Sequence, residues 1–503
     1  MKDFNVSILT AAHKSIPRGA RQNYKPYWSE ELERLDEELS AARREAETNP
    51  SQDNHNHLQH TKARFLRYKL QARRKSWRNK TASLNLEKDG TKLWRLTKQL
   101  NDEGNGRATT TLEADGQLLS GKQAANKFAD NYEEVSNIPV TKQHQREARR
   151  EQRERKTHQT TNDCMDKKLT LNELQAALRQ LKAKKSQGPD AITNEMLTHL
   201  GNKATCKLLE IFNHSWATGT LPQTWREATM IPILKKGKDP KQAASYRPIS
   251  LTSCVGKTMD RVVNQRLKWY LETNDLLLPE QAGFRQFRAT EDQTTYLAQE
   301  IEDAFQEKKV TRVAWIDIQR AFDRVWIDGL ITKLMRNGVA NNMLKWIQSY
   351  LFNRRARVSL DQLNSRKILL RQGVPQGGVL SATLFLVFIN DLVSELPRGV
   401  KAALYADDLV LWYKKEHAST ANYRIQQAID QLTAWTEDWC VTVNKDKSST
   451  SLFTVSPKKQ ARPIKIGTHT LKEEDQATYL GVTFDKSTAQ QHGLQLQRPT
   501  NNP

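Results

Sequence analysis

The chain has 503 residues, of which 37% are apolar, so it can form a sizeable core and about two to four domains and is not a disordered protein. Its 79 Lys and Arg residues outnumber 57 Asp and Glu residues, and the resulting net charge of +22 favours a polyanionic partner such as nucleic acid. Four scattered cysteines and a longest apolar stretch of only Val379 to Ile389 argue against a zinc knuckle, a secreted disulfide framework and a membrane span, so a soluble intracellular protein is expected.

The first 27 residues are basic and punctuated by Pro and Gly, which predicts a linker. Ser29 can cap a helix with an acidic first turn, and a second helix is expected around Leu58 to Leu86. Residues 61–80 hold nine basic and no acidic residues, interleaved with aromatic ones. We expect this helical arm to contact RNA or DNA phosphates through Arg64, Arg67, Lys69, Arg73, Arg74 and Lys75. The alternative is an amphipathic helix packed on the body.

The tract from Lys142 to Lys156 is rich in Gln, Arg and Glu without apolar periodicity, which predicts a mobile linker. Thr170 and Glu173 form a capping-box pattern that opens a helix, and Gly188-Pro189 is expected to stop this helix. Trp225 to Leu234 and Tyr246 to Leu251 are predicted to be the two strands of a hairpin with a basic loop between them. Helices are expected further along the chain, at Met259 to Leu271 and from Thr290 to Lys308.

Two later segments each predict a strand that ends in carboxylates. Arg312 to Ile318 is an apolar run carrying Asp317, and Asp407-Asp408 separates two further apolar runs, so this acidic pair must occupy a tight hairpin. The turn lacks Asn-Gly or Asp-Gly chemistry, and adjacent carboxylates repel one another unless cations meet them. An isolated Asp-Asp pair is often a solvated turn. If the segments are neighbouring strands, however, the three carboxylates can converge and bind two Mg²⁺ ions roughly 4 Å apart.

The last part of the chain adds four patterns. Gly373 to Ser381 opens a helix that runs to Asp391, and its glycines allow close backbone approach. A long amphipathic helix is expected over Thr420 to Cys440, followed by a strand at Thr450 to Val455. Residues 486–503 lack helical periodicity, which predicts an irregular tail.

These motifs, in this order from Lys182 to about Asp485, resemble the reverse transcriptases of non-LTR (LINE-type, jockey-like) retrotransposons. The resemblance implies an α+β right-hand polymerase with an antiparallel palm sheet covered by helices on one face, a helical fingers region and a helical basic extension before them. It also implies RNA-directed DNA synthesis that uses two Mg²⁺ ions, or Mn²⁺, with an RNA template, a DNA primer and dNTPs as partners. The nucleus or a cytoplasmic ribonucleoprotein is the location implied, and the oligomeric state stays open.

The resemblance implies that Tyr479 to Phe484 form the primer-grip hairpin of the palm. It also assigns residue roles. Asp317, Asp407 and Asp408 would be catalytic metal ligands, and Lys447, or the equally near Lys445, would protonate the leaving pyrophosphate. Arg247 and either Lys235 or Lys236 would grip the triphosphate, and a solvated basic loop is the alternative. Phe322 would form a wall under the sugar, and core packing is the alternative for this residue. Gln376 and Gly377 would contact the nascent base pair.

Some features depart from the family. The family usually has Ser after Gln-Gly and Pro after the following Ser. Here Gly378 and Ala382 occupy these two positions. We expect a linker remnant at residues 1–27, a basic extension at 28–160, fingers at 161–310, a palm at 311–485 and a tail at 486–503. The reverse transcriptase domain is expected at about 215–485. The family's endonuclease and helical thumb are expected to be missing.

Two rival functions stay open. The first is a catalytically weak or inactive fragment that binds RNA or DNA without turnover. The second is another metal-dependent phosphotransferase that uses the three aspartates, but it offers no reason for the Gln376-Gly377 motif or for the basic hairpin.

Overall fold

The computed structural model describes residues 1–15, 27–82, 110–114, 116–157, 163–361, 363–456 and 462–486. The chain divides into two compact units, one made of Met1–Leu9 with Thr109–Pro503 and the other of Thr10–Ala108. Helix α1 (Lys2–Ser15) lies where a linker was expected, so that prediction was wrong for these residues. The rest of the expected linker, residues 16–26, and the tail beyond residue 486 lie outside the described residues.

The smaller unit is a helical hairpin of α2 (Glu30–Thr48) and α3 (Gln52–Ala82). Ser29 caps α2 as expected, because its hydroxyl accepts a hydrogen bond from the backbone N–H of Leu32 at 3.3 Å. The apolar stripe of α2 packs against α3 through a small core formed by Leu32, Leu35, Leu39 and Phe65.

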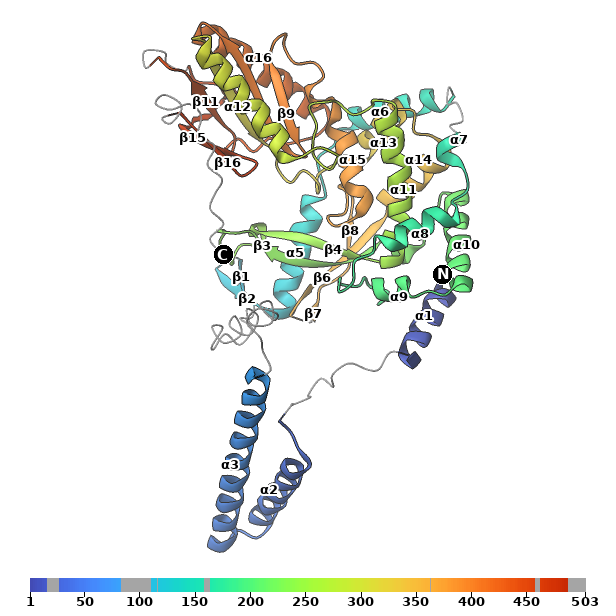
Figure 1. Cartoon of the computed structure of the whole chain (residues 1–503), viewed down its shortest axis with the longest axis vertical. Helices are drawn as coiled ribbons and strands as arrows, with labels where there is room; N and C mark the ends of the chain where they lie inside the picture. The colour runs from blue at the N-terminus through green and yellow to red at the C-terminus, as the bar shows by residue number, and fades with distance from the viewer. Residues whose placement is uncertain are drawn as a thin grey trace. The chain divides into compact units, whose positions relative to one another are not determined.

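The sheet that carries the aspartates has the strand order β14-β11-β5-β10-β9, with bounds Lys472–Glu473, Ser449–Phe453, Val310–Asp317, Asp408–Lys415 and Lys401–Tyr405. Its pairs are antiparallel except for the parallel pair β11–β14. Helix α12 (Thr290–Gln306) packs on the face of Val313 and Val410, whereas α16 (Ala418–Asp438) packs on the face of Ala314 and Leu411 (Figure 1). The sheet is therefore mixed and covered on both faces, which corrects the expected antiparallel sheet covered on one face and explains its continuous apolar strands.

A second mixed sheet contains the basic hairpin. Its order is β4-β3-β6-β7, with β8 also paired to β6, and the bounds are Tyr246–Thr252, Glu227–Leu234, Arg354–Leu360, Leu363–Asn364 and Ile368–Leu370. The predicted β3–β4 hairpin is confirmed, with Leu234 opposite Tyr246. Strands β3 and β6 are parallel, and helix α5 (Gly121–Val135) packs on the sheet through Phe128.

The remaining helices build most of the largest core. They are α7 (Asp163–Asp166), α8 (Leu171–Arg179), α9 (Asn194–Thr198), α10 (Asn202–Thr218), α11 (Cys254–Thr273), α13 (Ile327–Arg336), α14 (Asn341–Leu351) and α15 (Val379–Ile389), with 3₁₀ turns at Gln223–Trp225, Ala243–Ser245 and Asn390–Val393. The capping box at Thr170 is confirmed, but α8 ends at Arg179, so the predicted stop at Gly188-Pro189 was wrong. Short hairpins complete the unit: β1–β2 (Leu112–Ala114, Gln117–Leu119), β12–β13 (Lys465–Ile466, His469–Thr470) and β15–β16 (Gln476–Tyr479, Val482–Asp485).

Helix α6 (Lys142–Thr157) replaces the predicted mobile linker. Its Arg, Glu and Gln residues are strong helix formers and pair along the helix, as Arg155 does with Glu151 at 2.8 Å. Polar contacts dock it on α13, where Arg336 also binds Glu151 at 2.8 Å and the Gln152 amide donates to the Asp328 carbonyl at 2.9 Å. A helix anchored by polar contacts shows no apolar stripe, which is why the sequence pattern was misleading. Among the described residues, no helix has the length and apolar character needed to cross a membrane.

Candidate active site

The β9–β10 hairpin carries adjacent carboxylates at its tip. Tyr405 pairs with Asp408, so Ala406 and Asp407 form a two-residue connection, and the predicted tight hairpin is confirmed. Ala406 has a φ of +58°. This left-handed conformation falls at the first loop position, where such hairpins favour glycine. Neighbouring groups must therefore hold the turn in place.

Asp317 is the last residue of β5 and lies directly opposite Asp408 in the antiparallel register. Opposed residues share one face of a sheet, so β5 and the hairpin bring Asp317, Asp407 and Asp408 to the same end of it. The loop before β11 docks there too, because the Asn444 N–H donates to the Asp317 carbonyl at 2.8 Å. Lys447 of this loop places its Nζ 3.6 Å from Asp317 Oδ2.

The three carboxylates influence one another electrostatically. Burial, with a further contribution from Asp317, raises the pKa of Asp407. Burial together with Asp407 and Asp317 raises the pKa of Asp408 to about 6, although part of Asp408 reaches solvent. Burial is the larger cause of both shifts, and a bound cation would favour the ionised forms of both carboxylates.

The donor set fits a hard divalent cation, since Mg²⁺ and Mn²⁺ prefer carboxylate oxygens. Over the described ranges, no group of three or more His, Cys, Asp or Glu side chains is already arranged to hold a metal ion. The strand register nevertheless sets the backbone positions of Asp317 and Asp408, and aspartate side chains turn about two bonds. Side-chain rotation is therefore the adjustment that coordination would require.

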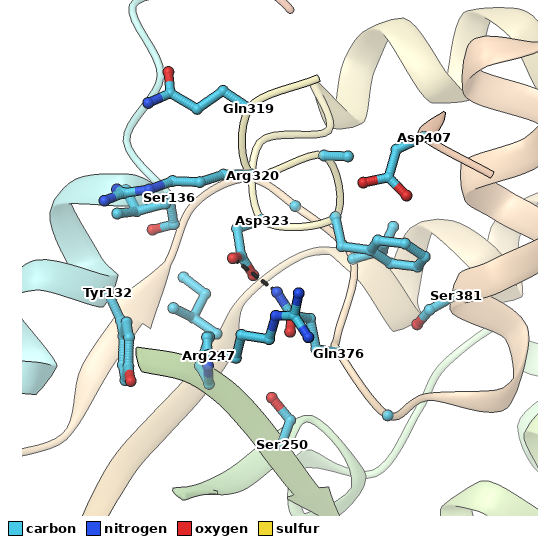
Figure 2. A pocket seen from close by; sticks show the side chains of 18 of the residues that line it. Tyr132, Ser136, Arg247, Ser250, Gln319, Arg320, Asp323, Gln376, Ser381 and Asp407 are labelled. Atoms are coloured by element: carbon cyan, nitrogen blue, oxygen red, sulfur yellow. Dashed lines mark hydrogen bonds between the residues drawn. The ribbon is translucent and has the colours of Figure 1, made fainter. Parts of the chain in front are cut away.

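A cleft of about 730 Å³ opens beside the hairpin (Figure 2). Eight of the residues singled out in the sequence line it: Lys235, Arg247, Asp317, Phe322, Gln376, Gly377, Asp407 and Lys447. Asp408 is outside the lining, as are Lys236 and Lys445, the two alternatives left open above. The structure thus brings the β3–β4 hairpin, the end of β5, the Gly-rich turn and the β9–β10 hairpin to one cavity.

Six cationic residues line this cleft: Lys235, Lys238, Arg247, Arg320, Arg354 and Lys447. Burial, and then the nearby charges of Arg320, Lys447 and Arg247, lower the pKa of Lys235. Mutual repulsion of this kind means that the cations are close enough to act on one bound anion. A polyphosphate is such an anion, because several of its oxygens can accept charge-assisted hydrogen bonds at once.

Gln376 is held at both its backbone and its side chain. Its carbonyl accepts from the Ser250 N–H at 2.9 Å, and its Nε2 donates to Asp323 Oδ2 at 2.8 Å (Figure 2). Next in the turn, Gly378 leaves no room for a side chain, since an added Cβ would lie 2.3 Å from the Tyr350 hydroxyl oxygen. The departure from the family's usual serine at this position therefore has a steric reason.

Asp323 should make stability depend on pH. Burial raises its pKa to about 6, against 3.8 for an ordinary aspartate, even though Gln376, Arg320 and Arg354 lower it. The folded protein then binds this proton more readily than the unfolded chain, so the group's stabilising contribution is full below pH 3.8 and is lost as the pH rises through about 6. We expect Asp323→Asn to change the melting temperature more favourably at pH 7.5 than at pH 5. Thermal unfolding of both proteins at both pH values measures this, with Asp446→Asn as an exposed control, and an equal change at both pH values would contradict it.

Phe322 lies between two other phenylalanines. Its ring stacks on Phe385 with centroids 4.7 Å apart and meets the edge of Phe284 at 6.2 Å. It is half-buried, packs against the main core and also lines the cleft. Both expected explanations, a cleft wall and core packing, thus describe part of its environment.

Several residues of the cleft were not predicted from the sequence. Arg320, Asp323 and Phe284 line it, and so do Tyr132 and Ser136 of the segment after α3 (Figure 2). Arg320 and Asp323 stand within six residues of Asp317, so their proximity to a predicted strand end was an available signal. Tyr132 had none, because α5 reaches the cleft only through its packing on the second sheet.

In the smaller unit, the predicted nucleic-acid-binding residues lie along α3. Arg67, Arg74 and Lys75 are exposed. Arg64 pairs with Glu38 at 3.4 Å, and Lys69 and Arg73 lie over the rings of Phe65 and Tyr27 at 5.3 and 5.9 Å. The first three cations are thus the most available to a phosphate backbone.

The carboxylate hairpin, the cationic strand hairpin and the Gly-rich turn around one cleft define a nucleotide polymerase domain. Residues 233–484, just over half of the chain, match the family described as reverse transcriptase (RNA-dependent DNA polymerase), and the chain belongs to this family.

Proteins from transposons resemble this chain over most of its length, in agreement with the motif order. The chain is similar to the probable RNA-directed DNA polymerase from transposon BS of Drosophila melanogaster, with 32% identity over 81% of this chain and 46% of the relative. It is also similar to the RNA-directed DNA polymerase from mobile element jockey of the same organism, with 29% identity over 86% of this chain and 48% of the relative. The chain thus spans about half the length of these curated relatives. A solved apo telomerase from Candida tropicalis, truncated from its C-terminal domain, aligns only loosely, with 12% identity, a TM-score of 0.38 and coverage of 58% and 59%.

Proposed function

We propose that this chain catalyses RNA-templated DNA synthesis, in which a primer 3′-hydroxyl attacks the α-phosphate of a dNTP. The observation that carries the proposal is the meeting of Asp317 and Asp407 with six cationic residues in one cleft. Carboxylates that attract metal ions and cations that attract a triphosphate are both needed, side by side, for nucleotidyl transfer. Neither group alone would distinguish this reaction from simple nucleic-acid binding.

In this proposal, Asp317, Asp407 and Asp408 hold two Mg²⁺ ions. Bound there, the ions would activate the primer hydroxyl and neutralise charge on the attacking and leaving oxygens. The raised pKa values of Asp407 and Asp408 support this role, because burial disfavours their ionised forms and a bound cation would favour them. The opposition of Asp317 and Asp408 supports it as well, since the strand register fixes their separation.

The cations would bind and orient the triphosphate. Lys235 and Arg247 face the cleft from the β3–β4 hairpin and would contact its outer phosphates. Lys447 reaches the carboxylate end of the cleft through Asp317, so it is suited to donate a proton from its Nζ to the pyrophosphate oxygen as the bond to the α-phosphate breaks. Phe322 would lie under the sugar, and Gln376 with Gly377 would contact the nascent base pair.

A primer-extension assay tests the proposal. The purified chain, an RNA template with an annealed DNA primer, dNTPs and Mg²⁺ should yield extended primer, and omission of the RNA template should abolish it. A chain that binds the primed template but never extends it would contradict the proposal and would support the binding-only alternative.

We also propose that the α2–α3 hairpin contacts the nucleic-acid backbone. Replacing Arg67, Arg74 and Lys75 together by Gln should weaken binding to single-stranded RNA and flatten the log–log salt dependence by about two units, because each phosphate contact contributes about −0.7. Sequence preference should stay unchanged, since phosphate contacts do not read bases. Fluorescence anisotropy over a salt series measures both quantities.

The matched control replaces Arg146, Arg150 and Arg153 of α6 by Gln, which removes the same charge from another exposed helix. It should leave the slope of the salt dependence near that of the parent. If the α3 variant instead keeps the parent slope and only melts at a lower temperature, the arm has a packing role and not a binding role.

A further inference from the structure

The segment Glu280–Gly283 pairs with the edge strand of the aspartate sheet. The Leu404 N–H donates to the Glu280 carbonyl, and the Ala282 N–H donates to the Leu404 carbonyl, both at 2.9 Å. These bonds form a parallel bridge between Gln281 and Leu404. The segment thereby reaches the base of the β9–β10 hairpin, although more than 120 residues separate the two in the sequence.

The side-chain amide of Gln281 grips the hairpin loop itself. The residue is 1% exposed. Its Oε1 accepts from the Ala406 N–H at 3.0 Å and from the Gly283 N–H at 2.8 Å, and its Nε2 donates to the Ala406 carbonyl at 3.4 Å. One buried amide thus satisfies the polar groups on both sides of Ala406, the residue with the left-handed backbone.

The backbone of the Glu280–Gly283 segment packs directly against the Ala406 turn. A Cβ at Gly283 would lie 2.3 Å from the Ala406 nitrogen, so the two backbones touch directly. Without the amide of Gln281, the Ala406 N–H would be buried without an acceptor, and an alanine rarely holds a positive φ without support. The next residue is Asp407, whose carboxylate lines the cleft.

We propose that Gln281 is a positioning residue for the polymerase reaction: its amide holds the Ala406 turn in the conformation that directs the Asp407 carboxylate into the cleft. This inference rests on the proposed function, because it assigns Asp407 a part in the reaction. Gln281 touches neither the substrate nor the metal in this account, and it acts only through the turn.

Gln281→Met tests the role, since methionine keeps the length and removes the hydrogen bonds. We expect kcat to fall by about 10- to 100-fold and the Mg²⁺ concentration for half-maximal activity to rise, while the KM for the primed template stays near the parent value. Adding Ala406→Gly should restore most of kcat, because glycine adopts the left-handed conformation unaided. A general packing defect would not be rescued at this one position.

The matched control is Gln293→Met. Gln293 is also buried and donates to the Glu280 carbonyl at 3.1 Å, but it does not touch the turn, so this variant should keep the parent Mg²⁺ dependence. If Gln281→Met does not fold, Gln281→Asn shortens the same amide by one carbon and should shift kcat and the Mg²⁺ dependence in the same direction. Parent-like kinetics in the Gln281 variant, or a loss that Ala406→Gly leaves unrestored, would overturn the inference.

Two measurements separate this inference from the proposed function. Hydrogen–deuterium exchange of the peptide that covers Tyr405 to Asp408 should be faster in Gln281→Met, whether or not the protein polymerises. Mn²⁺ binding by calorimetry should be weaker in Gln281→Met and restored in the double variant. If the parent chain fails to extend primers, the proposed function is wrong. If Gln281→Met has the exchange rate and the Mn²⁺ affinity of the parent, the inference about Gln281 is wrong, whether or not the parent polymerises.

Discussion

Asp407→Ala is expected to lower primer extension by about 1,000-fold or more, because it removes a proposed ligand of the metal ions that would stabilise the charge of the transition state. Binding of the primed template should change little, since the cations of the cleft and of the arm remain. Single-turnover extension, together with anisotropy for binding, measures the two effects. Asp430→Ala, an exposed aspartate on α16, is the control and should extend primers like the parent.

The same variant should also respond differently to metal. Asp407 is held with a raised pKa, so its ionised form destabilises the metal-free fold near neutral pH, and its removal should raise the melting temperature there. Mg²⁺ should stabilise the parent protein more than the variant. Equal extension by parent and variant, or an equal gain in melting temperature on adding Mg²⁺, would show that Asp407 is not a metal ligand in the reaction.

Phe322→Val is expected to raise the use of ribonucleotides relative to deoxynucleotides by about 10- to 100-fold, because a smaller side chain leaves room for a 2′-hydroxyl. The stack on Phe385 at 4.7 Å holds the native ring in place, so it cannot swing aside for the larger sugar. The ratio of kcat/KM for a matched rNTP and dNTP pair measures the change.

Phe352→Val is the control for Phe322, since it makes the same substitution at a phenylalanine that is 37% exposed and outside the cleft lining. Its nucleotide ratio should equal that of the parent. An active Phe322→Val protein with an unchanged ratio would leave Phe322 with the core-packing role alone.

Local patterns in the sequence determined much of this protein. The apolar runs around Asp317 and around Asp407-Asp408 predicted the strands β5, β9 and β10, because side chains buried on both faces of a sheet leave a continuous apolar signal. Pro, Gly and basic residues between two apolar runs likewise predicted the β3–β4 hairpin. The order of these motifs also carried the family, which the match over residues 233–484 confirms.

Other features were decided only by tertiary structure. The sequence could not specify that Asp317 lies opposite Asp408, because register depends on pairing between segments about 90 residues apart. Helix α6 has no apolar stripe and is docked by Arg336 and Gln152 contacts that no local pattern encodes. The roles of Gln281 at the Ala406 turn and of Tyr132 in the cleft wall have the same origin, since each contact joins residues distant in sequence and depends on how the sheets and helices pack together.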